Sequence, residues 1–250
     1  MSSLNRWSDE ETEKIHQMRS ILADQLRLSP PYAEVVGDRK LLRFLRGHNH
    51  DVAKASEMMS QFLQWRMDTN ADKIRADIVR GGKNHPNKFP NGKKFLTLIP
   101  QVIIAHDALD IHGSPMSLEQ YNFSPSQIFK ECTLDEYLEF VVYSLEYKSL
   151  VLEQLSEERE REWLQTRTDS TSEKGGSDKD PLNYGVILNM CIVRDLNGVG
   201  KIFKSSSSLA NNVHMSFTGV VRMIFFPFFS HESAYDFFHL VRSYRFQITH

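Results

Sequence analysis

The sequence predicts an α/β fold in which an N-terminal helical lobe precedes an incomplete α/β lobe with a mainly parallel sheet. Two observations support this fold class. Residues 38–65 carry apolar side chains at helical spacing on two consecutive segments. Further along, a short strand, a long helix and a nearly continuous apolar run follow one another, which is the order of a βαβ unit with a parallel strand pair.

The composition is that of a folded protein. Of the 250 residues, 40% are hydrophobic and 16 are Phe, which is enough for a buried core. The formal net charge of -2 gives no electrostatic reason to expect a nucleic-acid partner. Cys132 and Cys191 lie far apart without a CxxC motif, so reduced thiols are favoured over a disulfide.

The N-terminal residues 1–14 are polar and acidic and lack the apolar core of a secretory signal. The most apolar tract, residues 220–229, is interrupted by Arg222 and Pro227 and is shorter than the ~20 residues that span a bilayer. We therefore expect a soluble, cytoplasmic protein.

The first helix is expected to begin beside Ser8. Ser8 and Glu11 have the spacing of a capping box, in which each side chain accepts a hydrogen bond from the other residue's backbone N–H. The helix that follows carries one apolar face: Ile15, Met18, Leu22 and Leu26. Because proline lacks a backbone N–H, the Ser29-Pro30-Pro31 segment is expected to end this helix.

Residues 38–65 read as two helices joined by a very short loop, with Asp51 as the N-cap of the second. Five apolar residues recur on these segments and are predicted to form the core of the helical lobe: Leu42, Phe44, Leu45, Phe62 and Leu63. A short helix over residues 71–78 completes the lobe, which we place at residues 1–80. Residues 81–94 are rich in turn formers and are interpreted as a linker.

Residues 95–200 are interpreted as the partial α/β lobe. A turn at residues 110–115 precedes a short strand at residues 116–122. Thr133 and Glu136 then form a second capping box, which opens a long helix.

The second strand of the βαβ unit is expected after a polar loop. Residues 166–180 are polar and contain glycines, so a disordered loop is expected there. Residues 186–193, VILNMCIV, have the composition of a strand that is buried on both faces.

Enzyme motifs are incomplete in this chain. Residues 198–201, GVGK, follow a strand but lack the remaining positions of a phosphate-binding loop. A helix beginning at His231 has Tyr235 where a zinc-protease motif requires its second histidine. His106-Asp107 has no GxSxG nucleophile to assist. We therefore expect a protein that is not an enzyme and that uses no cofactor or metal.

Several of these segments resemble the CRAL-TRIO family. The strings LLRFLR and FLQWR, the Asp110-x-x-Gly113-x-Pro115 turn, Glu146 within the long helix, and Asp195-Leu196-Asn197-Gly198 stand in that family's order. The resemblance covers residues 38–200. It implies a hydrophobic pocket between sheet and helices that encloses the acyl chains of a lipid, with each buried CH₂ contributing ~0.8 kcal/mol.

The resemblance also implies which residues would meet the lipid. His48 and Asn49 stand where phosphoinositide-binding members carry a basic pair, so phosphate recognition is weakened there. Positions that meet the headgroup in phosphatidylcholine-binding members are occupied here by four residues: His106, Ser117, Met190 and Ile192. Of these, Ser117 alone keeps a hydroxyl. Met190 and Ile192 can equally be ordinary core residues.

Residues 201–250 match nothing in the family's second half, so the lipid-binding domain is expected to be truncated. This tail is either a divergent terminus or the product of an intron or a frameshift. The function implied is non-catalytic, cytosolic lipid binding or transfer, with a hydrophobic lipid ligand and transient contact with a membrane surface. Because Met190 and Ile192 offer no hydrogen-bond partner to a polar headgroup, the lipid is expected to be chosen by apolar fit. The alternatives are a scaffold that kept the fold but lost lipid transfer, and an enzyme of the α/β class.

Overall fold

The structure is a computed structural model that describes residues 7–110, 113–120, 128, 130–169 and 187–195. The described residues divide into two compact units. Residues 10–64 form a helical unit, and residues 65–195, with residues 7–9, form a second unit that holds the sheet. Each unit is described by itself.

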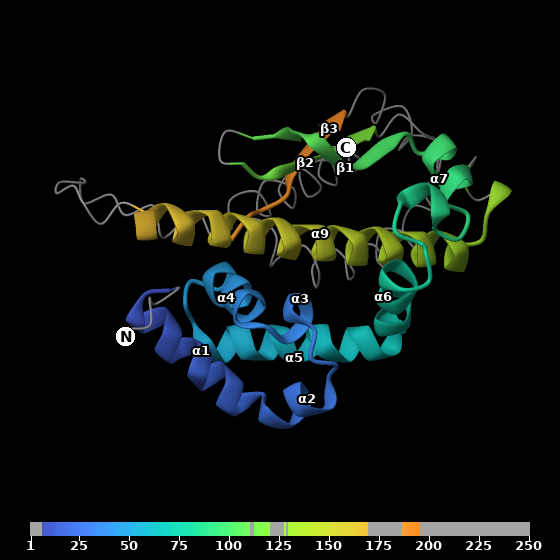
Figure 1. The fold of residues 1–250 in the computed structure, drawn as a ribbon. Helices are drawn as coiled ribbons and strands as arrows, with labels where there is room; N and C mark the ends of the chain where they lie inside the picture. Colours follow the sequence, from blue (N-terminus) through green and yellow to red (C-terminus); the bar gives the residue numbers. More distant parts are fainter. Residues whose placement is uncertain (1–6, 111–112, 121–127, 129, 170–186, 196–250) are drawn as a thin grey trace, which may run out of the picture. The chain divides into compact units, whose positions relative to one another are not determined.

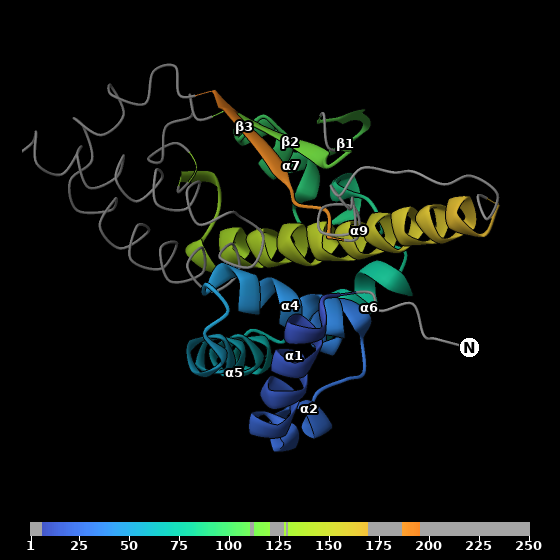
Figure 2. The ribbon, with the colours of Figure 1, turned by 90° about the vertical axis from the view of Figure 1, so that its left-hand side faces the viewer.

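The helical unit contains α1 (Asp9–Ile21), α2 (Ala23–Leu28), α3 (Ala33–Val36), α4 (Asp38–Gly47) and most of α5 (Val52–Asp68). Figure 2 shows α5 nearly end-on beside α1 and α4. The five predicted core residues are all buried, and the rings of Phe44 and Phe62 lie 5.6 Å apart. The sequence prediction of this core is therefore confirmed. The single helix predicted before Ser29 is divided at Leu22 into α1 and α2, of which α2 ends before Ser29 as expected. The second helix of the predicted pair, α5, begins after Asp51 as expected.

The turn between α4 and α5 is tight. Asn49 and His50 both have positive φ, at 52° and 60°, a conformation that asparagine adopts more easily than most residues. The Asp51 carboxylate then accepts a hydrogen bond from the backbone N–H of Lys54 at 3.1 Å, which confirms Asp51 as an N-cap. This bond from Lys54 holds the pKa of Asp51 below its ordinary value.

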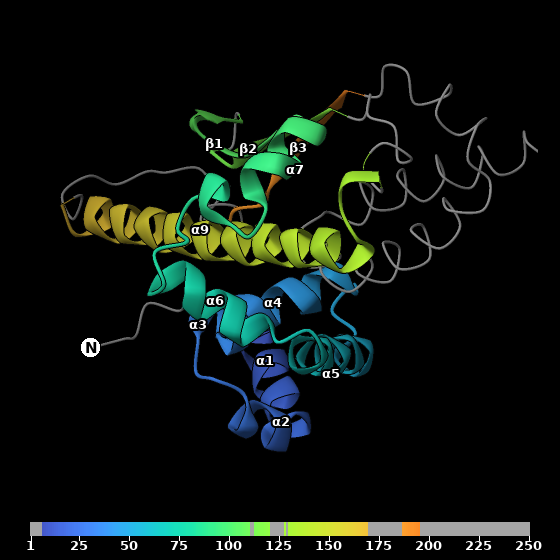
Figure 3. The ribbon, with the colours of Figure 1, turned by 90° about the vertical axis from the view of Figure 1, so that its right-hand side faces the viewer.

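The second unit contains α6 (Ala71–Val79), η1 (Pro86–Lys88), α7 (Gly92–Leu98), β1 (Gln101–Leu109), β2 (Pro115–Gln120), α9 (Leu134–Asp169) and β3 (Cys191–Asp195). Within it, α9 runs between the sheet and α6 (Figures 1 and 3). The stretch interpreted as a linker, residues 81–94, holds η1 and the start of α7.

The described sheet has the order β1-β2-β3. β2 and β3 are parallel, as the predicted strand–helix–strand order requires, with Met116 opposite Cys191 and Gln120 opposite Asp195. β1 and β2 are antiparallel, so the expectation of a mainly parallel sheet is wrong for the described strands. The reason is that the sequence analysis did not predict β1. The turn at Asp110 joins β1 to β2 as a hairpin, so the two strands run in opposite directions.

The last strand also differs from its prediction. β3 begins at Cys191, five residues later than expected, and Val193 is exposed, so this strand is not buried on both faces. Both cysteines are free thiols, as expected.

The long helix begins as predicted. The Glu136 backbone N–H donates to the Thr133 hydroxyl at 3.2 Å, and the Thr133 N–H donates to the Glu136 carboxylate at 2.8 Å. The helix continues to Asp169, so residues 166–169 of the expected loop are helical. The rest of that loop, and the tail at residues 201–250, lie outside the described residues.

Candidate functional site

The α9-facing side of the sheet brings together two of the residues that the sequence analysis associated with lipid binding, and a third lies just before it in the chain. Side chains alternate across β2: Ser117 is fully buried whereas Leu118 is exposed. Ser117 stands opposite Ile192 in the register of β2 and β3. Met190, two residues before Ile192, is buried as well. The structure therefore places Ser117 and Ile192 side by side in the sheet, with Met190 buried just before β3 begins.

The Ser117 hydroxyl has a partner inside the sheet. It donates to the backbone carbonyl oxygen of Val102 in β1 at 3.3 Å. This is long for an O–H···O hydrogen bond, whose usual distance is about 2.7–2.8 Å, so the bond is weak. A weakly bound, buried hydroxyl can exchange its partner for a stronger acceptor at small loss of energy.

A buried ion pair lies in the same layer and was missed by the sequence analysis. The Lys148 ammonium in α9 contacts the Glu119 carboxylate in β2 at 3.3 Å, and the two side chains are only 8% and 11% exposed. Glu119 follows Ser117 by two residues and so belongs to the same side of β2. The available signal was the alternation of inward-facing and outward-facing side chains along the predicted strand. It could have identified Glu119 as an inward carboxylate in need of a cation.

A second buried ion pair anchors α9 on its other side. Arg66 at the end of α5 donates to both oxygens of Glu146, at 2.7 and 3.0 Å, and its Nε donates to Asp72 in α6 at 3.1 Å. Residues two apart on a helix point about 200° apart, so Glu146 and Lys148 face opposite ways. The Arg66 fork is bidentate, which fixes geometry as well as adding energy. Glu146, singled out by the family resemblance, thus contacts the α5–α6 corner of this unit.

The remaining predicted residues lie elsewhere. His48 is the C-cap of α4, and its ring Nδ1 donates to the Phe44 carbonyl oxygen at 2.9 Å, because a carbonyl can only accept. Asn49 follows it in the exposed α4–α5 turn. Both belong to the helical unit. His106 lies in β1.

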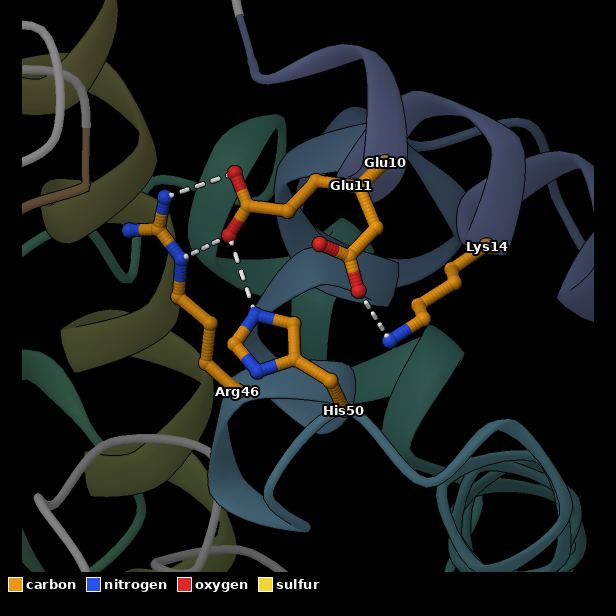
Figure 4. A network of polar contacts seen from close by, with 5 residues as sticks. All are labelled: Glu10, Glu11, Lys14, Arg46 and His50. Carbon is orange, nitrogen blue, oxygen red and sulfur yellow. Dashed lines mark hydrogen bonds and ion pairs between the residues drawn. The ribbon is translucent and has the colours of Figure 1, made fainter.

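The α4–α5 turn is held by a polar network with α1 (Figure 4). The Glu11 carboxylate accepts from Arg46 at 2.7 and 3.1 Å and contacts the His50 ring at 3.2 Å. Beside it, Lys14 pairs with Glu10 at 2.7 Å. These contacts connect α1 with the turn and fix the backbone around His48 and Asn49.

The described part of the chain shows no cluster of three or more His, Cys, Asp or Glu side chains that could hold a metal ion. Among the same residues, no helix is long and apolar enough to cross a bilayer.

No model of a known protein family matches the chain. The chain is nevertheless similar to phosphatidylinositol/phosphatidylcholine transfer proteins of Arabidopsis thaliana. It is 27% identical to the one named SFH7 over 133 residues, which is 53% of this chain and 22% of that relative. It is 29% identical to SFH4 over 107 residues, which is 42% of this chain and 16% of that relative.

A similar match extends further along the chain. The Sec14 cytosolic factor of Schizosaccharomyces pombe is 26% identical over 170 residues, which is 68% of this chain and 47% of that protein. The chain thus spans about a fifth of the length of the Arabidopsis relatives and about half of the yeast protein. These similarities support the resemblance to the CRAL-TRIO family, and the names of the Arabidopsis relatives describe lipid transfer and not catalysis.

Proposed function

We propose that this protein binds a phospholipid and transfers it between membranes without catalysing a reaction. The observation that carries the proposal is the similarity to phosphatidylinositol/phosphatidylcholine transfer proteins, which covers about half of the chain. Phosphatidylinositol and phosphatidylcholine are accordingly the first ligands to test.

The α9-facing side of the sheet is the proposed lipid-binding surface. Its apolar members, Met190 and Ile192, would contact the lipid, and Ser117 would offer the one hydroxyl kept from the expected headgroup set. Each CH₂ of an acyl chain taken from water into apolar surroundings contributes ~0.8 kcal/mol, so enclosing the chains is enough to compete with a bilayer. His48, Asn49 and His106 remain proposed lipid-contacting residues.

A transfer assay tests this proposal. Donor liposomes carrying fluorescent phosphatidylcholine or phosphatidylinositol are mixed with acceptor liposomes, with and without the full chain. We expect the protein to accelerate transfer of at least one of the two lipids. The absence of both acceleration and bound lipid would contradict the proposal and favour the scaffold alternative.

Two neighbouring residues of β3 offer a matched pair of variants. Ile192→Trp fills the α9-facing side, whereas Val193→Trp adds the same volume on the exposed side of the strand. We expect Ile192→Trp to reduce lipid transfer at least tenfold and Val193→Trp to leave it within twofold. If both variants reduced lipid transfer equally, the lipid would not bind at this side of the sheet.

A further inference from the structure

We propose that the Lys148 ammonium binds the phosphate group of a glycerophospholipid, and that the Glu119 carboxylate pairs with this ammonium until the phosphate replaces it. This inference rests on the proposed function and names the polar contact within it. Lys148 and Glu119 face each other at 3.3 Å between α9 and β2, on the same side of the sheet as Ser117.

The pair is a poor choice for stability alone. Removing two charges from water imposes a desolvation penalty of several kcal/mol per ion, which the mutual attraction offsets only with excellent geometry. The contact between the Lys148 ammonium and the Glu119 carboxylate, at 3.3 Å, is longer than the shortest contact of the bidentate Arg66–Glu146 pair, at 2.7 Å. A looser contact is easier to exchange for another anion.

The chemistry of the two groups suits an exchange of anions. A lysine ammonium is a compact point charge with three donors on a flexible stem, and it binds phosphate oxygens without a fixed angle. A phosphate diester carries one negative charge, like the Glu119 carboxylate that it would replace. The ammonium is therefore paired with one anion before and after the exchange, and the released Glu119 carboxylate takes up a proton from water, so that the layer gains no net charge.

The surroundings provide a second polar contact and a rigid frame. The Ser117 and Glu119 Cα atoms are about 7 Å apart along β2, so the hydroxyl can reach one phosphate oxygen while Lys148 contacts another. The weak bond of Ser117 to Val102, at 3.3 Å, is easily given up. On the opposite side of α9, the Arg66–Glu146 contacts hold the helix that carries Lys148.

This assignment changes the expectation raised by Met190 and Ile192. Those residues cannot hydrogen-bond a headgroup, and a phosphate desolvated against them alone would incur a large penalty. Lys148 supplies the missing charge from the helix, not from β3. The ligand class is therefore a glycerophospholipid and not an uncharged lipid of the same acyl length.

The test compares phosphatidylcholine with diacylglycerol of the same acyl chains, using binding titrations of fluorescent analogues. Lys148→Met removes the charge at similar length, and Lys148→Arg keeps it. We expect Lys148→Met to weaken phosphatidylcholine binding at least tenfold and to leave diacylglycerol binding within twofold, while Lys148→Arg retains most phospholipid binding. Glu119→Gln removes the competing anion and should strengthen phosphatidylcholine binding severalfold.

A double variant separates loss of the phosphate contact from loss of binding through misfolding. Lys148→Met leaves the Glu119 carboxylate buried without this cation, whereas Lys148→Met combined with Glu119→Gln leaves neither charge of the pair. The double variant should show the same selective loss of phosphatidylcholine. If the variants lost affinity for both lipids equally, or if the ratio of the two affinities stayed unchanged, the role of Lys148 would be overturned and the proposed function would remain. A wild-type chain that binds neither lipid would overturn both.

Discussion

Gly113 is the residue whose backbone the structure constrains most clearly. Its φ is +78° and its N–H donates to the Asp110 carbonyl oxygen at 2.9 Å, while the Ser114 N–H donates to the Asp110 carboxylate at 2.7 Å. A Cβ on Gly113 would lie 1.7 Å from the Arg159 guanidinium on α9. The β1–β2 turn therefore depends on glycine for its conformation, whereas the Arg159 guanidinium, at the end of a flexible side chain, can move away from an added Cβ.

We expect Gly113→Ala to lower the free energy of unfolding by about 1–3 kcal/mol, because it combines a strained positive φ with displacement of Arg159. Gly82→Ala is the matched control. Gly82 also has a positive φ, +73°, but no atom lies within 4 Å of its Cβ position. Urea unfolding of both variants would separate the two effects, and an equal loss in both would show that the Arg159 contact has no energetic weight.

The Tyr143 hydroxyl is the centre of a second local cluster. It donates to the Asp77 carboxylate at 2.8 Å, and Lys83 donates to both groups at 3.1 and 3.0 Å. The hydrogen bond from Tyr143 and then that from Lys83 lower the pKa of Asp77 below its ordinary value of 3.8. A lowered carboxyl pKa stabilises the fold above pH 3.8, and this contribution is lost as the pH falls through the lower pKa of the folded protein.

We expect Tyr143→Phe to reduce stability by about 1 kcal/mol at pH 7, because the ring stays and one hydrogen bond to a charged group is lost. The value stays small because Asp77 is partly exposed to water. The difference from wild type should shrink as the pH is lowered below 3.8. Unfolding curves at pH 7 and at pH 3 measure it, and a difference that is the same at both pH values would contradict the linkage with Asp77.

At the scale of elements, each unit has its own packing. In the helical unit α4 and α5 meet through Phe44 and Phe62, and the Lys40 ammonium lies 4.3 Å from the centre of the Phe62 ring. In the second unit α7 and α9 meet through Phe95 and Phe140, whose rings stack at 4.9 Å. Aromatic pairs of this kind contribute ~0.5–1.5 kcal/mol beyond the area that they bury.

Phe62→Ala should lower the free energy of unfolding by about 3–5 kcal/mol, because it leaves a cavity among buried side chains. Met67→Ala, in the same helix at an exposed position, is the control and should change stability by less than about 0.5 kcal/mol. Thermal melts of both variants test the assignment. A melting temperature unchanged by Phe62→Ala would mean that Phe62 is not part of the core.

At the scale of the whole molecule, a bound phospholipid should stabilise the folded chain by mass action. A ligand present at 100 times its Kd adds ~2.7 kcal/mol to the free energy of unfolding. For a chain of this size, that raises the Tm by roughly 5–10 °C. A melt with saturating phosphatidylcholine, compared with diacylglycerol, measures the shift. A scaffold that has lost lipid binding would show no shift with either lipid.

Local sequence patterns predicted much of the secondary structure. The caps at Asp51 and Thr133 and the core around Phe44 follow from residues that are neighbours in sequence or share one helical face. The parallel strand pair follows from the order of strand, helix and strand. β1 escaped prediction because its apolar run lacks a clean alternation, and a strand of that kind is defined by the partner across its hairpin.

By itself the sequence determined where α5 and α9 begin and which side chains form the helical core, because these features depend on local spacing and capping chemistry. The order of strand, long helix and strand also required one parallel strand pair. The tertiary structure decided that the described sheet is mixed, that Ser117 and Ile192 stand side by side, and that Lys148 meets Glu119. Those contacts join residues up to 75 positions apart. Strand register and helix rotation bring such residues together, and both are set by packing between elements.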